Sequence, residues 1–338
     1  MGDPRLLLDQ WGPDYDGTYN VADPEGTADS SRELEAGVEL PEADWRPVQP
    51  GPVDHMPVTW FLDGSRRMEA RAYLESDSGQ LNIGGLGSTA VGAVLVRPGQ
   101  RAVFEDTVQV RRWCLLGGGA QYTSIELPAL PGWPGALRYE PHGVPDAGPE
   151  ALMQGLQTLM RDQERLLAAR IAAADPDALI VLDGPLPGRG ASPHMLGYLK
   201  TTSVMRLDAE AMRVVRSLKA GERSPIYRVG ASGDPTAFFE WWLRLRDPLQ
   251  WQFSLAGTVR LQLSAAPDAA RRLNQAKLLA DWSCRHLPGF ATLQHQDPRA
   301  PQQLLPTRAL EAELRRRMGS VELLRRRLLT GHFATVRA

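Results

Sequence analysis

The sequence predicts a mixed α/β fold, a sheet flanked by helices, and three observations support this prediction. From residue 58 to about 140, short apolar runs bounded by turn residues, with apolar residues alternating from Met68 to Leu74, indicate strands. The period then changes to that of an amphipathic helix over residues 149–174. A short, continuously apolar segment, "ALIVLDGPL", follows at residues 178–186, as expected for a central strand covered on both faces.

Length and composition exclude several classes of protein. The chain has 338 residues, of which 43% are hydrophobic and 23% charged, so it is neither disordered nor fibrous. This length fits one elaborate domain or two small ones with a buried core. The chain has only two cysteines, Cys114 and Cys284, so it has no disulfide framework and no cysteine-based zinc site. Because no apolar run approaches the ~20 residues that span a bilayer, and the N-terminus lacks a secretory pattern, we expect a cytoplasmic protein.

The charge is distributed unevenly along the chain. Residues 1–57 contain 13 acidic and three basic residues, a net charge of −10, which leaves +8 on the other 281 residues. Weak periodicity and frequent Pro and Gly indicate that residues 1–57 are an acidic, irregular extension of a main domain at 58–338. A positively charged domain could bind a polyanion, and the extension could shield that surface or contact a basic partner. A simple solvated extension is the alternative.

The first strands of the domain are predicted from residue 58 onward. The segment "VTWFLDGS" (58–65) is an apolar run ending in Asp63-Gly64, and alternating residues from Met68 to Leu74 follow it, which indicates strand, turn and strand. A third strand is predicted at 88–96, and further short strands over 102–140. The long helix begins at Pro149 and ends before Asp175.

Helices and short strands are also predicted after the central strand. The helices are expected near 207–218, 267–285, 307–317 and 320–329, and the strands near 224–229, 237–245 and 258–263. The last two helices are basic. The aromatic segment "FFEWWLRLRD" (238–247) is interpreted as a strand with core side chains rather than as a platform for stacking bases.

Three carboxylates occupy positions suited to ligand binding. Asp63 and Asp183 each follow an apolar strand and precede a glycine, and Glu164 lies on the helix before the second of these strands. A strand end projects its last side chain into the crevice beside a sheet, and the glycine lets a ligand approach. Together these carboxylates would form an all-oxygen cluster suited to Mg²⁺ or Mn²⁺. Two ions about 4 Å apart would activate water and stabilise the leaving oxygen of a phosphodiester.

The order of these elements along the chain indicates the fold more specifically than any single acidic residue does. Three hairpin-like strands with an Asp, a helix with a Glu and a central strand with an Asp form the ribonuclease-H-like order, in which the first and fourth strands pair. Arg66 and Arg67 follow the first Asp-Gly, and Lys200 follows the second. They could hold the phosphates beside the cleaved bond without sequence specificity. Each could instead be a surface charge.

Four segments of the chain resemble the NurA nucleases, the partners of HerA-type hexameric ATPases in DNA end processing. They are "WFLDGSRR" (60–67), "MRDQERLLA" (160–168), "LIVLDGPL" (179–186) and "LGYLKTTSVMRL" (196–207). The resemblance spans roughly residues 57–318. By position, Asp63, Glu164 and Asp183 match the acidic metal ligands of the family, and Lys200 matches the lysine of its Lys-Thr segment.

The resemblance implies a function as well as a fold. It implies a ribonuclease-H-like core, with additional strands and C-terminal helices here, that binds one or two Mn²⁺ or Mg²⁺ ions per active site. The expected activities are those of a 5'–3' exonuclease and a single-strand endonuclease in end resection and double-strand break repair. The expected partners are DNA, a second copy of the chain and a HerA-type ATPase.

The C-terminal part departs from the family pattern. Many members have a Tyr-Pro and a His near the last helix, whereas "APQQLLPTRALEAELRRR" (300–317) has neither Tyr nor His. Glu311 lies near the expected position of that His and could be a fourth oxygen ligand. We therefore interpret the chain as a divergent, bacterial-type branch. Two alternatives stay open: a catalytically weak subunit that binds DNA ends or regulates the ATPase, and a nuclease for RNA–DNA hybrids.

Overall fold

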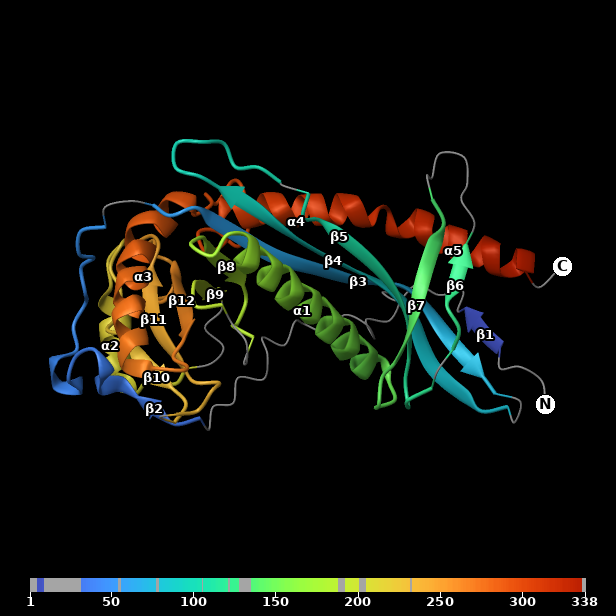
Figure 1. Cartoon of the computed structure of the whole chain (residues 1–338), viewed down its shortest axis with the longest axis horizontal. Coiled ribbons are helices and arrows are strands. Elements are labelled where there is room, and N and C mark those ends of the chain that lie inside the picture. The colour runs from blue at the N-terminus through green and yellow to red at the C-terminus, as the bar shows by residue number, and fades with distance from the viewer. Residues whose placement is uncertain are drawn as a thin grey trace.

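The computed structural model describes residues 5–8, 32–53, 56–76, 79–104, 106–120, 122–127, 135–187, 192–200, 205–231 and 233–335. It confirms the α/β class, because a large mixed sheet is flanked by helices (Figure 1). The strands are β1 (Arg5–Leu8), β2 (Leu34–Glu35), β3 (Thr59–Glu75), β4 (Leu81–Val96), β5 (Gln109–Leu116), β6 (Ile125–Leu127), β7 (Leu137–Gly143), β8 (Leu179–Asp183), β9 (Met195–Leu199), β10 (Tyr227–Val229), β11 (Phe238–Arg244) and β12 (Thr258–Ser264). The helices are α1 (Pro149–Ala174), α2 (Ala209–Ser217), α3 (Ala269–Phe290), α4 (Leu305–Met318) and α5 (Val321–Thr335). The described strands form one sheet in the order β2-β10-β11-β12-β9-β8-β3-β4-β5-β7-β6, and β1 pairs with β3.

A long antiparallel hairpin, β3 and β4, forms the centre of this sheet. The turn predicted at Asp63-Gly64 is wrong, because β3 runs through it as a single strand of 17 residues. Asp63 pairs with Gly92 of β4, which continues opposite it and supplies a partner on both sides of the Asp-Gly pair. The chain reverses instead at residues 76–80, where Gly79 has a φ of +80° and donates its N–H to Ser76 O.

Helices cover both faces of this hairpin. α1 packs on one face through buried side chains that include Leu156 and Met160, and α4 packs on the other through Leu310. Two glycines lie on opposite faces of the hairpin: a Cβ on Gly64 would contact Met160 of α1, whereas a Cβ on Gly92 would contact Leu310 of α4. Burying one leucine stabilises the fold by about 1.5–3 kcal/mol, so these contacts hold both helices firmly against β3.

The sheet continues beyond β3 into a second group of strands. β8 lies parallel to β3 with Leu182 opposite Leu62, so the two strands that carry Asp63 and Asp183 are neighbours. The segment at 179–182 is buried, as predicted for a central strand. β9, which no sequence pattern predicted, runs parallel to β8 and antiparallel to β12. In β11, Trp241 and Trp242 are buried on opposite faces, toward α3 and α2, so this strand carries core aromatics as predicted.

The described part of the acidic extension packs on the same sheet. β1 pairs with β3 at residues 72–75, and β2 pairs with β10 at 228–229. A buried ion pair joins Glu39 to Arg223, with an O–N distance of 2.8 Å, and the Trp45 ring lies 6.2 Å from that of Tyr227. Residues 1–4 and 9–31, with seven of the 13 acidic residues, lie outside the described part. Among the described helices, none combines the length and apolar character needed to cross a membrane.

Candidate metal centre

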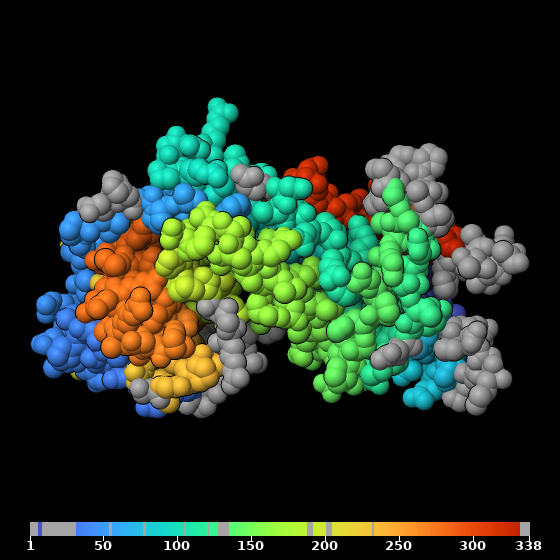
Figure 2. Space-filling model, viewed as in Figure 1, coloured from blue at the N-terminus to red at the C-terminus, as the bar shows by residue number. Residues whose placement is uncertain are grey.

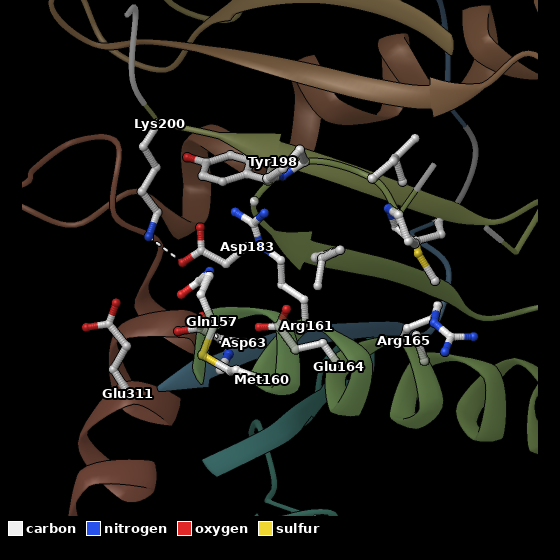
Figure 3. A pocket seen from close by; sticks show the side chains of 18 of the residues that line it. Asp63, Gln157, Met160, Arg161, Glu164, Arg165, Asp183, Tyr198, Lys200 and Glu311 are labelled. Carbon is white, nitrogen blue, oxygen red and sulfur yellow. Dashed lines mark hydrogen bonds and ion pairs between the residues drawn. The ribbon is translucent and has the colours of Figure 1, made fainter. Parts of the chain in front are cut away.

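Three carboxylates meet where β8 ends beside β3 (Figure 3). One oxygen each of Asp63, Asp183 and Glu311 lies within 4.8 Å of the other two. The last residue pair between β3 and β8 joins Leu62 to Leu182, and β3 continues beyond it. The side chains of Asp63 and Asp183 therefore meet at a step in the sheet. They face α4, which contributes Glu311.

Local structure explains the position of each carboxylate. Gly184 has a φ of +129°, which turns the chain directly after Asp183 and confirms the strand end predicted there. On α4, Leu310 and Leu314 are one helical turn apart and both are fully buried against the sheet. This packing places Glu311, the residue after Leu310, over the end of β8.

Glu164 reaches the same cavity from the other face of the sheet. The cavity has a volume of about 540 Å³, and all four carboxylates line it. It lies where the surface is hollowed between the α3 lobe and the ridge of α1 (Figure 2). A Cβ on Gly64 would collide with Glu164 Oε1 and would lie 2.8 Å from Met160 Cγ, so the glycine lets α1 approach β3 closely. Glu164 is not one of the three carboxylates within 4.8 Å of one another, but its charge acts on Asp63.

Cationic side chains and one amide contact the cluster. Lys200 directly follows β9, and its Nζ donates to Asp183 and to Gln303 Oε1. The guanidinium of Arg299 donates to both oxygens of Glu311 at 2.7 Å. Gln303 Nε2 also donates to Glu311, at 3.1 Å. Asp63 accepts a hydrogen bond from a backbone group instead: Gly64 N–H donates to its Oδ1 at 2.8 Å.

Burial and mutual repulsion shift the pKa values of the cluster in different directions. Burial raises the pKa of Asp63 well above its ordinary value, and the charge of Asp183 raises it further. Burial also raises the pKa of Asp183, although Lys200 counteracts this effect. Burial acts in the same direction on Glu311, but Arg299 and Lys200 outweigh it, so the pKa of Glu311 is lowered. In the absence of a metal ion, Asp63 and Asp183 are therefore harder to ionise than free aspartates.

The predicted arginines occupy different positions relative to this cavity. Arg66 donates from Nε to Gln157 Oε1, and Gln157 lines the cavity. Arg67 donates to Glu69 and, at 3.0 Å, to the carbonyl of Met318 at the end of α4. Neither arginine is among the residues that line the cavity, whereas Lys200 is. A role for Arg66 and Arg67 in DNA binding stays a prediction.

Several residues of the site were not predicted from the sequence. Arg299 and Gln303 come from the irregular segment before α4, and Arg161 and Arg165 line the cavity from α1. Tyr198 of β9 donates its hydroxyl to Gln302 O at 2.6 Å. The sequence does indicate Arg161 and Arg165, because they lie three residues before and one residue after Glu164 on the predicted helix. For Arg299, which lies in no regular element, the sequence offers no comparable pattern.

The donor set fits a hard divalent cation. All four acidic groups offer carboxylate oxygens, which suit Mg²⁺ or Mn²⁺ better than the nitrogen and sulfur ligands that zinc prefers. Because burial and acidic neighbours raise the pKa of Asp63, a cation in the cluster would compete with a proton for this carboxylate. The residues present therefore fit the expected metal.

Comparison with known proteins gives no independent assignment. No protein-family model matches this chain, and no curated protein matches it either.

Proposed function

We propose that this protein is a divalent-metal-dependent DNA nuclease of the NurA type, with a ribonuclease-H-like core. The strand order β5-β4-β3-β8-β9 supports this fold assignment, since β3 to β5 are antiparallel and β8 and β9 are parallel to β3. α1 precedes β8 in the chain, as that core requires. The observation that carries the proposal is the grouping of Asp63, Asp183 and Glu311 at the step between β3 and β8.

The carboxylates would hold one or two Mn²⁺ or Mg²⁺ ions. Asp63, Asp183 and Glu311 would hold one ion, and Glu164 would complete a second set with Asp63. When bound, such ions supply Lewis-acid activation of water and stabilise the leaving oxygen of a phosphodiester.

The other residues of the cavity have distinct roles in this proposal. Arg299 holds the carboxylate of Glu311 in a fixed orientation through two parallel hydrogen bonds. Lys200 holds Asp183 and places a positive charge beside the cluster, where it would stabilise negative charge on a phosphate. Arg161 and Arg165, which line the cavity on α1, would bind the backbone phosphates on either side of the cleaved bond.

The resemblance to NurA extends the proposal to substrate and partners. We propose DNA ends as the substrate, with exonuclease and single-strand endonuclease activity in end resection and double-strand break repair. A homodimer and a HerA-type hexameric ATPase are the proposed partners.

A nuclease assay tests this proposal directly. End-labelled single-stranded DNA, duplex DNA and an RNA–DNA hybrid are incubated with the protein in Mn²⁺, Mg²⁺ or EDTA. Wild type is compared with Asp63→Asn, Asp183→Asn and the control Asp106→Asn, an exposed residue on the connection between β4 and β5. We expect metal-dependent cleavage of DNA that both site variants lose and the control retains.

Each of the other outcomes would support a different conclusion. Cleavage that survives both site variants would show that the metal binds at another place. Preferential cleavage of the hybrid would favour the RNA–DNA hybrid nuclease. Absence of cleavage by wild type, with and without the ATPase, would favour a subunit that binds DNA ends or regulates the ATPase.

A further inference from the structure

The connection between β11 and β12, residues 245–257, presents large apolar side chains to solvent. Trp251 is 75% exposed, Phe253 is 61% exposed and Leu249 is 46% exposed. Trp251 is the most exposed large hydrophobic residue in the described part of the chain. Aromatic side chains contribute much of the burial energy of a fold, so two that stay exposed on one short loop indicate a surface that binds something.

This loop is anchored at its base. The guanidinium of Arg244, which is fully buried, donates to the carbonyls of Ser254 and Ala256 at 2.9 and 2.6 Å. Leu255 is buried against the α2 side of the sheet, and Leu245 N–H bonds to Gly257 O at 2.8 Å. The exposed aromatics therefore project from a loop that is held in place on both sides.

The loop and the carboxylate cluster lie at the same end of neighbouring strands, because β12 begins where β8 and β9 end. β12 runs antiparallel to β9 with Arg260 opposite Leu199, so the start of β12 lies next to Lys200 (Figure 1). Since neighbouring strands are about 5 Å apart, β12 lies about 10 Å from β8, which ends at Asp183. A Cβ on Gly257 would lie 3.5 Å from Pro301, two residues before the Gln303 that contacts Lys200.

The residues around the loop give it a positive charge. Arg216, Lys219 and Arg246 are exposed beside it, and the carboxylate of Asp247 accepts a hydrogen bond from Ala220 N–H at 2.8 Å. Exposed aromatic rings among cations are typical of surfaces that bind single-stranded nucleic acid, where bases stack on the rings and cations contact the phosphates.

We propose that Trp251 and Phe253 form a stacking platform for unpaired bases of single-stranded DNA beside the metal centre. This inference rests on the proposed nuclease function and specifies its substrate: a strand that is unpaired next to the bond to be cut. Stacking is tolerant of sequence because every base has an aromatic face. The platform would therefore hold any single strand near Lys200 and the carboxylates.

Binding without cleavage tests the platform separately from the chemistry. The probe is a fluorescein-labelled oligothymidine of roughly 20 nucleotides, longer than common single-strand site sizes, followed by anisotropy in EDTA. We expect Trp251→Ala to weaken binding by roughly 5- to 150-fold, the range given by loss of one base–aromatic stack. Trp251→Phe should retain most of the affinity, and Trp251→Leu should lose it. Phe104→Ala is the matched control and should bind like wild type. Phe104 is an exposed aromatic on the connection after β4, which ends at Val96 opposite the start of β3.

An abasic oligonucleotide of the same length separates stacking from phosphate contacts. Wild type should bind it more weakly than oligothymidine, whereas the double variant Trp251→Ala/Phe253→Ala should bind both equally. Equal affinity of wild type and Trp251→Ala for oligothymidine, or no binding by wild type, would overturn the inference. Full affinity of Trp251→Leu would also overturn it, since it would show that the site needs an apolar group and not a ring. Cleavage of the same probe in Mn²⁺ is scored independently, so either proposal can fail while the other stands.

Discussion

Arg299 and Glu311 form a two-point contact in which Nη1 and Nη2 each donate to a different carboxylate oxygen at 2.7 Å. Arg299 also contacts Asp297, with an N–O distance of 3.0 Å, which fixes the guanidinium itself. Glu311 is thereby held toward Asp63 and Asp183 although it comes from a helix far along the chain. This contact makes Glu311 an oriented member of the cluster and leads to a prediction about metal affinity.

Glu311→Gln should weaken Mn²⁺ binding by at least roughly tenfold, because it removes one charged oxygen ligand from the cluster while keeping the shape of the side chain. Glu313→Gln is the control. Glu313 lies on the same helix, two residues further, but pairs with Arg316 and Arg317. Isothermal titration with Mn²⁺ gives both affinities. Equal weakening by the two substitutions would mean that Glu311 acts only through the general charge of α4.

Asp63→Asn should stabilise the metal-free protein while abolishing cleavage. Burial and the charge of Asp183 raise the pKa of Asp63, so ionising this carboxyl costs free energy in the folded protein, and a neutral amide avoids that cost. We expect an increase of about 1 kcal/mol or more in the free energy of unfolding, or roughly 2–4 °C in Tm. Thermal unfolding in EDTA measures it, with Asp162→Asn as the exposed control. A fall in Tm would show that the charged form of Asp63 contributes to folding.

The stability gained from Mn²⁺ should increase with pH. The folded-state pKa values of Asp63 and Asp183 are raised above 3.8, so their contribution to the stability of the metal-free protein is complete below about 3.8 and is lost as pH rises through the raised values. Glu311 has a lowered pKa, so its own contribution is complete above about 4.5. A cation competes with protons for the aspartates, so the Tm difference between Mn²⁺ and EDTA should widen as pH rises above about 4.5. A difference that stays constant as pH rises would contradict the raised pKa values of the aspartates.

The strand ends show which parts of the site could be predicted from the sequence. Asp183-Gly184 ends β8 as predicted, since Gly184 adopts a positive φ and the chain turns. Asp63-Gly64 has the same pattern but lies inside β3, because β4 continues opposite it. A local pattern cannot distinguish these cases, since the difference depends on the length of the partner strand.

The remaining members of the site differ in the same way. Glu311 was predicted from its position relative to the His of the NurA pattern, and the packing of Leu310 and Leu314 on the sheet fixes the face of α4 that carries it. Arg299 belongs to no periodic element, so only the folded chain shows that it contacts Glu311. The loop with Trp251 was not predicted as a surface feature, because the aromatic-rich strand directly before it is fully consistent with a core strand.

Gly64→Ala tests whether the close approach of α1 to β3 positions Glu164. The added methyl group would collide with Glu164 Oε1 and approach Met160 Cγ to 2.8 Å, so α1 or the carboxylate must move. We expect a loss of about 1–3 kcal/mol in the free energy of unfolding, as for other overpacked sites. We also expect cleavage to fall by at least roughly tenfold at a temperature where the variant is fully folded, because Glu164 leaves its position beside Asp63. Gly37→Ala is the control, since a Cβ there meets nothing within 4 Å. Wild-type cleavage by a destabilised Gly64→Ala would show that the glycine serves packing alone and that Glu164 is not required at that position.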